Sequence, residues 1–248
     1  ADAVAEKGWL AAHKWLILRR ISQFGILGLF LLGPLAGVWI VKGNLNYSLT
    51  LDILPLTDPY VALQSLLTGH VPEKLGVIGV AIVLAVYFLV GGRVYCSWAC
   101  PVNIVTDAAG WLRDRLGIKG SVHLARATRY WILAMTLAGS AATGVVLWEL
   151  VNPVSMLHRG LIFGLGAAWT VVLAVFLFDL FVMSRGWCGH LCPVGAFYSL
   201  LARWSPLRVS APRRQDCNDC MDCFEVCPEP QVIRPALKGE GKGVGPVI

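Results

Sequence analysis

Charged side chains are scarce in this chain. Only 15% of its 248 residues are Asp, Glu, Lys or Arg, whereas 56% are apolar, and the mean hydropathy is +0.65. Soluble domains of ordinary composition have about 25% charged residues, so the composition excludes that class. The chain is therefore predicted to be an integral membrane protein, and its net charge of +6 is not expected to serve nucleic-acid binding.

The long apolar stretches lack the alternation of apolar and polar residues that the strands of a membrane barrel require. They are continuous runs, each long enough for a helix to cross a hydrocarbon core, which takes about 20 residues. An all-α fold with four transmembrane helices is therefore predicted. The four runs cover residues 21–41, 75–92, 130–151 and 161–183.

Two further absences narrow the class. The five histidines do not place a pair in the middle of facing spans, so a haem with two histidine ligands is not expected. Arg19 and Arg20 precede an apolar run, as in an export signal, but no small-residue cleavage site follows and the run is too long for a signal peptide. These arginines are interpreted as anchors of the first span.

Lysine and arginine are distributed unevenly among the segments outside the spans. Eighteen of the 21 lie in residues 1–20, 93–129 and 184–248, and the remaining two loops contain only Lys42, Lys74 and Arg159. The positive-inside rule therefore predicts a multi-pass protein of the bacterial inner membrane with both termini in the cytoplasm. Residues 1–20 are amphipathic and are expected to lie on the inner leaflet or to dock a partner.

A Cys-x3-Cys-Pro-Val phrase occurs twice, each time after an apolar run. Each phrase closes a half that holds two spans, so residues 21–117 and 130–205 are predicted to be parallel repeats within a four-helix membrane domain, 21–205. Such a bundle would bring four thiols together at the cytoplasmic boundary. The steps Asp58-Pro59 and Asn152-Pro153 are expected in outer loops, where Trp148 and Tyr60 would anchor the interface. The four cysteines, called the loop cysteines below, are Cys96, Cys100, Cys188 and Cys192.

The chemistry of the loop cysteines stays open at this point. Disulfides are rare in the reducing cytoplasm, so metal or redox use is favoured. Four thiolates suit an iron–sulfur cluster or a tetrahedral zinc or iron ion. A redox-active thiol pair without metal is an alternative, as is the view that buried cysteine is only a small apolar residue.

A second cysteine pattern lies near the C-terminus. Its spacing, C-x2-C-x2-C-x3-C-P, is that of bacterial ferredoxins, in which three thiolates hold one [4Fe–4S] cluster and the fourth serves a second cluster. A zinc site is the competing interpretation. No second motif follows, so residues 206–248 are expected to be a cytoplasmic ferredoxin-type segment that is incomplete at its C-terminus, or else to need a fourth ligand from elsewhere. The motif consists of Cys217, Cys220, Cys223 and Cys227.

Three phrases resemble the NapH family, the membrane ferredoxin-type proteins of the periplasmic nitrate reductase system. They are Cys96-Ser-Trp-Ala-Cys-Pro-Val-Asn, Gly186-Trp-Cys-Gly-His-Leu-Cys-Pro-Val-Gly-Ala and Cys220-Met-Asp-Cys-Phe-Glu-Val-Cys-Pro-Glu-Pro. The likeness extends over nearly the whole chain. The family carries a second C-terminal ferredoxin motif, and its absence here puts the role of Cys227 in doubt.

The resemblance implies a quinol dehydrogenase component that works with partner subunits. It would oxidise quinol and pass electrons through iron–sulfur centres to a NapG-like periplasmic subunit, which feeds a cytochrome and the catalytic subunit of nitrate reductase. Because one hop across about 30 Å of bilayer is too slow, the loop cysteines are the expected relay. The alternative is a membrane iron–sulfur protein for metalloenzyme maturation or redox sensing.

Quinol oxidation releases protons and calls for an acceptor near the headgroup. Glu149 and Asp179 are the only acids in or at the predicted spans, where an acid is costly and therefore a functional candidate. Two structural alternatives remain: Asp179 would form an ion pair with Arg185, and Glu149 would be a solvated helix end.

Overall fold

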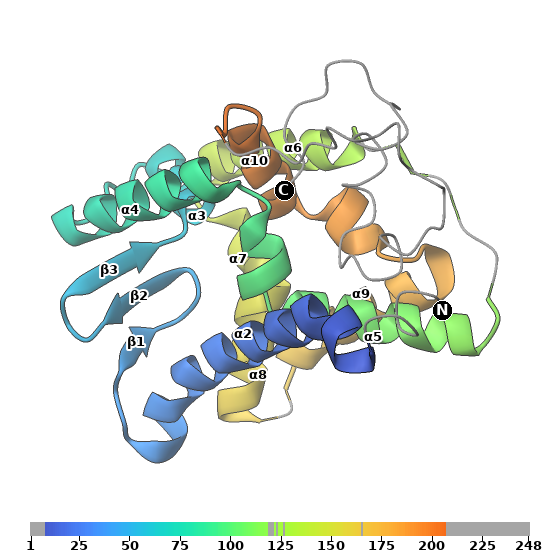
Figure 1. The fold of residues 1–248 in the computed structure, drawn as a ribbon. Coiled ribbons are helices and arrows are strands. Elements are labelled where there is room, and N and C mark those ends of the chain that lie inside the picture. Colours follow the sequence, from blue (N-terminus) through green and yellow to red (C-terminus); the bar gives the residue numbers. More distant parts are fainter. Residues whose placement is uncertain (1–7, 119–121, 123, 126, 165, 207–248) are drawn as a thin grey trace.

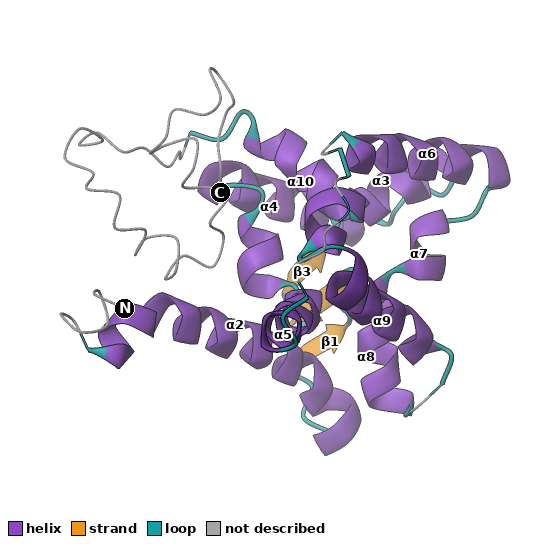
Figure 2. Cartoon of the chain, turned by 90° about the vertical axis from the view of Figure 1, so that its right-hand side faces the viewer, coloured by secondary structure: helices purple, strands orange, loops and turns teal. Residues whose placement is uncertain are grey.

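A computed structural model describes residues 8–118, 122, 124–125, 127–164 and 166–206. Most of the described chain is helical (Figures 1 and 2). The ferredoxin motif of Cys217, Cys220, Cys223 and Cys227 lies outside the described residues.

The first half of the chain combines helices with a small sheet. Its helices are α2 (Trp9–Ala36), α3 (Pro59–Leu67), α4 (Lys74–Val90), the π-helical turn η1 (Tyr95–Ala99) and α5 (Val102–Arg115). Its strands are β1 (Val41–Gly43), β2 (Tyr47–Thr50) and β3 (Leu54–Thr57).

The described part of the second half is helical. Its elements are α6 (Thr128–Thr143), α7 (Leu147–Val151), α8 (Pro153–Phe163), α9 (Ala168–Leu177), the π-helical turns η2 (Phe178–Val182) and η3 (Trp187–Leu191), and α10 (Pro193–Ala202).

The all-α prediction is wrong for residues 41–57, which form an antiparallel sheet with the order β1-β2-β3. Val41 pairs with Thr50 across the first two strands. The side chain of Asn44 accepts hydrogen bonds from the backbone N–H groups of Asn46 and Tyr47, which closes the turn between those strands. The polar turn residues thus begin a hairpin directly after the first apolar run.

Helices occupy all four predicted runs, with different limits. Gly37 and Gly144 adopt left-handed φ values of 73° and 69° and end α2 and α6, as is common for glycine after a helix. The fourth run is divided by Gly164 between α8 and α9. Among the described residues one helical segment, His13–Ala36, has the length and hydropathy needed to cross a membrane, and the other apolar helices are shorter.

The two halves interlock through equivalent contacts. In each half the first long helix contacts the half's own cysteine-bearing turn, α2 with η1 and α6 with η3. The last helix of each half packs against the opposite half, α5 on α9 and α10 on α4. The short helices do the same, since α3 contacts α6 and α8 contacts α2. Figure 1 shows α10 beside α6 and α4. In Figure 2 α5 is seen end-on, with α2 on its left and its neighbour α9 on its right.

One of these interlocking contacts is close at Gly92, just after α4. A Cβ atom there would lie 2.1 Å from the backbone oxygen of Tyr198 in α10. We expect Gly92→Ala to lower the free energy of unfolding by about 1–3 kcal/mol or more. The added methyl group would clash with the backbone of α10, which cannot move aside as a flexible side chain can. Thermal unfolding of the purified protein in detergent measures this loss.

Gly28→Ala is the matched control for Gly92→Ala. Gly28 lies within α2, and a Cβ atom there would meet no neighbouring element within 4 Å, so alanine should leave the protein as stable or more stable. Equal unfolding temperatures for the two variants would contradict the close contact between α4 and α10.

Candidate functional site

One cavity brings the loop cysteines together. All four line its wall, and each is partly buried and free of a disulfide bond. The sequence predicted this convergence. The wall also includes Asp58, Trp148 and Asn152, which the sequence placed at the outer face, and Asn46, for which the sequence made no prediction.

The local sequence explains how each thiol pair reaches the cavity. The residues of each Cys-x3-Cys phrase form a π-helical turn, which is closed when Cys100 N–H donates to Tyr95 O (3.0 Å) and Cys192 N–H donates to Trp187 O (2.9 Å). π-Helical turns are rare and occur often at functional sites. Both second cysteines have extended backbone, with ψ of 119° and 114°, as expected for a residue that precedes proline.

A new helix begins directly after each second cysteine. The sulfur of Cys100 accepts hydrogen bonds from the N–H groups of Val102 and Asn103 at the start of α5. The sulfur of Cys192 accepts the equivalent bonds from Val194 and Gly195 in α10. Backbone donors therefore face both sulfur atoms, as they would for a negatively charged thiolate.

Burial acts in the opposite direction on the thiol acidities. It raises the pKa of Cys100 to about 12, and it also raises the pKa of Cys188 and Cys192. Without a bound cation these thiols stay protonated at neutral pH. Coordination to a metal deprotonates a thiol outright, so the cavity favours thiolates only when they hold a metal centre.

The expectation that Asp58 and Asn152 lie in outer loops away from the cysteines is wrong, because both line the cavity. Each caps a short helix. Asp58 Oδ1 accepts from Tyr60 N–H (2.7 Å) at the start of α3, and Asn152 Oδ1 accepts from Val154 N–H (3.1 Å) at the start of α8. The sequence analysis treated both segments as loops because α3 and α8, with 9 and 11 residues, are too short to be recognised as membrane spans.

Tyr60 and Trp148 are also misplaced by the sequence analysis. Neither is an interface anchor, because their exposed fractions are 0% and 3%. They pack together in the aromatic core with ring centroids 6.3 Å apart. At Asp58, burial is the larger influence and raises the pKa of the carboxyl to about 6. The hydrogen bonds from the N–H groups of the helix start oppose this rise and offset only part of it.

Glu149 lies within a hydrogen-bonded network next to the cavity. Its Oε1 accepts from Asn46 Nδ2 and Asn152 Nδ2, both at 2.7 Å, and its Oε2 accepts from the Ser155 hydroxyl at 3.1 Å. The alternative of a solvated helix end therefore does not describe it. Since Asn46 and Asn152 line the cavity, Glu149 is one hydrogen bond from the wall and stays a candidate proton acceptor.

Asp179 accepts a hydrogen bond from the turn that carries Cys188. It is fully buried, and its Oδ1 accepts from the Trp187 N–H (2.9 Å) at the start of η3. The predicted partner Arg185 instead contacts Asp107, with Nη2 3.5 Å from Oδ1. Asp179 thus positions the turn that carries Cys188, and its role as a proton acceptor stays a prediction.

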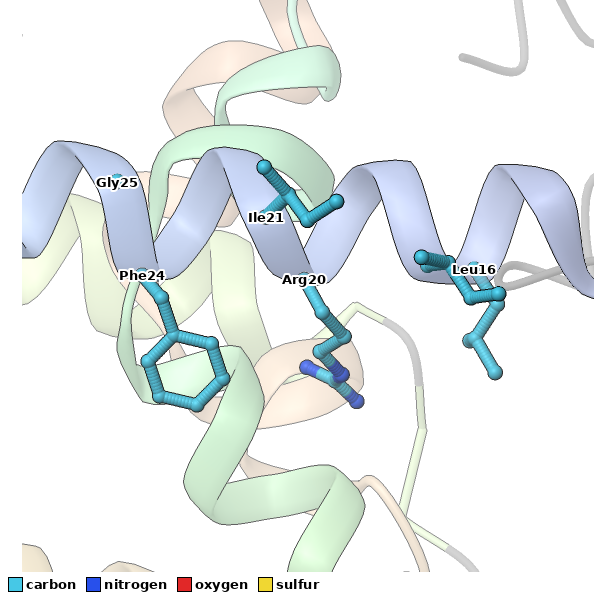
Figure 3. A pocket seen from close by; sticks show the side chains of 6 residues that line it. Leu16, Arg20, Ile21, Phe24 and Gly25 are labelled. Atoms are coloured by element: carbon cyan, nitrogen blue, oxygen red, sulfur yellow. The ribbon is translucent and has the colours of Figure 1, made fainter.

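Arg19 and Arg20 are not simple membrane anchors. The Arg19 side chain is fully buried and donates to Asn103 Oδ1 at 2.7 Å, and both arginines form ion pairs with Asp107 of α5. Arg20 also borders a shallow apolar groove along α2, where it leaves the helix on the same side as Phe24 (Figure 3). The arginine pair therefore fixes α2 against α5, the helix that begins after Cys100.

The donor set of the cavity fits an iron–sulfur cluster. Four thiols that form no disulfide line one cavity, and backbone N–H groups reach two of the sulfur atoms. Among the described residues, no three His, Cys, Asp or Glu side chains converge closely enough to hold a single metal ion. A mononuclear zinc or iron site draws its sulfur ligands to about 2.3 Å from one point, whereas a cluster binds them at separate corners.

Comparisons with known proteins agree with this chemistry. A family model described as a 4Fe-4S binding domain matches residues 74–119 and 163–212, the two segments that carry the loop cysteines. The methylamine utilisation ferredoxin-type protein MauN of Methylorubrum extorquens is 58% identical over 97% of this chain and 84% of its own length. The ferredoxin-type protein NapH of Escherichia coli K12 is 49% identical over 96% of this chain and 83% of its own. No solved structure matches.

The helical fold and the cysteine-lined cavity, together with this match, define an iron–sulfur protein with a ferredoxin-type 4Fe–4S domain. The chain belongs to the family of ferredoxin-type proteins that includes MauN and NapH. The resemblance found in the sequence is thereby confirmed.

Proposed function

We propose that this protein is a membrane electron-transfer subunit that oxidises quinol and passes the electrons through iron–sulfur centres to a ferredoxin-like partner. The observation that carries the proposal is the convergence of the four loop cysteines on one cavity, within the segments that match a 4Fe–4S binding domain. A multi-pass position in the bacterial inner membrane, with both termini cytoplasmic, is part of the proposal.

Each group at the cavity has a defined role in this proposal. A bound iron–sulfur cluster supplies one-electron transfer. The loop cysteines hold it, and the N–H groups at the starts of α5 and α10 stabilise the charge on their sulfur atoms. Glu149, next to the cavity wall, is the candidate acceptor for quinol protons. Its network with Asn46 and Asn152 connects it to the wall.

The electron acceptor is either a NapG-like subunit of a nitrate reductase system or the corresponding partner in methylamine utilisation. The second is favoured by identity. The MauN proteins of Methylorubrum extorquens and Paracoccus denitrificans are 58% and 55% identical to this chain, compared with 49% for NapH of Escherichia coli. In both cases the membrane subunit would deliver quinol electrons to a soluble iron–sulfur partner.

Reduction by quinol tests the proposal directly. We expect anaerobic addition of a water-soluble quinol to bleach the visible absorption of the purified full-length protein when its partner subunit is present. Oxidised quinone should form in proportion to the electrons accepted. If the clusters do not respond to quinol while a deletion strain makes an immature metalloenzyme, the protein serves cofactor maturation or sensing instead.

A further inference from the structure

Four helices begin at the cysteine-lined cavity. They are α3, α5, α8 and α10, which contain 9, 14, 11 and 10 residues. Each is preceded by a residue-proline step, and in each step the residue before proline lines the cavity. These four residues are Asp58, Cys100, Asn152 and Cys192.

This arrangement directs positive electrostatic potential at the cavity. The start of a helix carries roughly half a positive elementary charge, which arises from backbone N–H groups that lack partners within the helix. Such helix starts are binding sites for anions. Here the side chains of Asp58, Cys100 and Cys192 each accept two of those N–H groups. Four helix starts around one cavity therefore stabilise negative charge inside it.

The indole of Trp148 is an independent indication of a bound acceptor. Trp148 lines the cavity, is only 3% exposed, and its Nε1–H group has no hydrogen-bond partner. A buried donor without an acceptor destabilises a folded protein, and such donors are rare. An electron-rich atom of a cofactor in the cavity, such as a cluster sulfide, supplies the acceptor that the protein does not.

Asp58 places a carboxylate on the cavity wall. Its negative charge counteracts the positive potential of the four helix starts. The duplication places Asn152, a neutral residue of the same shape, at the equivalent step of the second half. Asp and Asn cap helices about equally well, so capping alone does not require the acid. The acid at position 58 therefore adds negative charge to the cavity wall that the capping of α3 does not require.

We infer that the four helix starts and the Trp148 indole N–H set the reduction potential of the centre held by the loop cysteines, raising it, while Asp58 lowers it. The inference rests on the proposed function, which supplies the centre. Reduction adds one electron to the centre and breaks none of its bonds. Each quinol supplies two electrons, one per reduction of the centre, and becomes quinone as its two O–H protons are released, for which Glu149 is the candidate acceptor. The added negative charge is stabilised by N–H donors of residues on the cavity wall and destabilised by a carboxylate on the same wall. The protein thereby sets the potential at which this relay accepts electrons.

The test is a redox titration of the full-length protein at pH 8, followed by EPR after anaerobic reconstitution with iron and sulfide. The signal of the cavity is the one lost in Cys188→Ser. Trp148→Phe keeps the ring and removes the donor, so we expect the ratio of reduced to oxidised centre at a fixed potential to fall about tenfold, which corresponds to a decrease of about 59 mV. Trp169→Phe is the matched control, because Trp169 Nε1 also lacks a partner but lies outside this cavity.

Removal of the charge at Asp58 tests the carboxylate. Asp58→Asn should raise the potential, because asparagine keeps a cap of the same shape and removes the negative charge. Asn152 is left unchanged, since its Nδ2 donates to Glu149 Oε1 at 2.7 Å. Equal potentials for Trp148→Phe, Trp169→Phe and the wild type would overturn the inference, even though a cluster is present. If the reconstituted wild type shows no signal that depends on Cys188, the proposed function fails, and the inference fails with it.

Discussion

Replacing Cys188 with serine should remove one iron–sulfur cluster from the protein and abolish its reduction by quinol. The hydroxyl of serine is a poor ligand for iron in place of a thiolate, so the cavity should lose its centre, about four iron atoms per chain for a [4Fe–4S] cluster. We expect the quinol-linked rate to fall roughly hundredfold or more. Iron and acid-labile sulfide analysis, EPR and anaerobic quinol assays measure the three effects. Cys96→Ser should have the same result, since both thiols line one cavity.

The C-terminal motif supplies the control for this experiment. Cys220→Ser should remove a different EPR signal and leave the signal of the cavity in place, because its motif is separate in sequence from the loop cysteines. Membrane insertion should be unchanged in all three variants, as the substitutions are small. Full quinol-linked activity in both Cys96→Ser and Cys188→Ser would disprove a shared site.

The sequence predicted the meeting of the loop cysteines because duplication leaves a visible signal. Two phrases of the same pattern, each directly after an apolar run, predict equivalent positions in a twofold arrangement, and the four thiols do line one cavity. The presence of paired thiols likewise predicts metal or redox chemistry from the sequence alone. A repeated motif thus predicts a convergence even when the helices around it are placed inaccurately.

The sequence did not predict that residues besides the cysteines line the cavity. Asp58 and Asn152 were visible as residue-proline steps, but the helices that they begin contain only 9 and 11 residues. Hydropathy over about 20 residues averages such short helices into loops. Trp148 was assigned to the interface for the same reason. A residue-proline step repeated in both halves was the signal that indicated two helix starts.

The buried charge network was also hidden in the sequence. Arg19 and Arg20 precede an apolar run, a pattern typical of membrane anchors, and their partner Asp107 is more than 80 residues away. Ion pairing over such a separation depends on tertiary packing, which local pattern does not encode. Because α2 packs against η1, the turn directly before α5, Arg19 reaches Asn103 and Asp107 of that helix.

Asp107→Asn should be among the most destabilising single changes in the protein. Asp107 forms ion pairs with Arg19, Arg20 and Arg185, and its side chain is only 12% exposed. Asparagine keeps the shape but removes the charge, which leaves the fully buried guanidinium of Arg19 without its carboxylate. Breaking a buried ion pair in this way costs about 3–5 kcal/mol. Thermal unfolding in detergent should therefore show a large decrease in the unfolding temperature.

Asp52→Asn is the comparison that separates burial from charge. Asp52 pairs with Lys42 at 2.7 Å, but the two side chains are 61% and 47% exposed, and an exposed pair contributes about 0–1 kcal/mol. High salt should weaken this surface pair and change the Asp107 network much less, because buried charges are poorly screened. Equal losses of stability in the two variants would show that the arginines do not fix α2 against α5. If Asp107→Asn alone is strongly destabilising, the same ion pairs that hold α2 also fix the start of α5, where Cys100 faces the cavity.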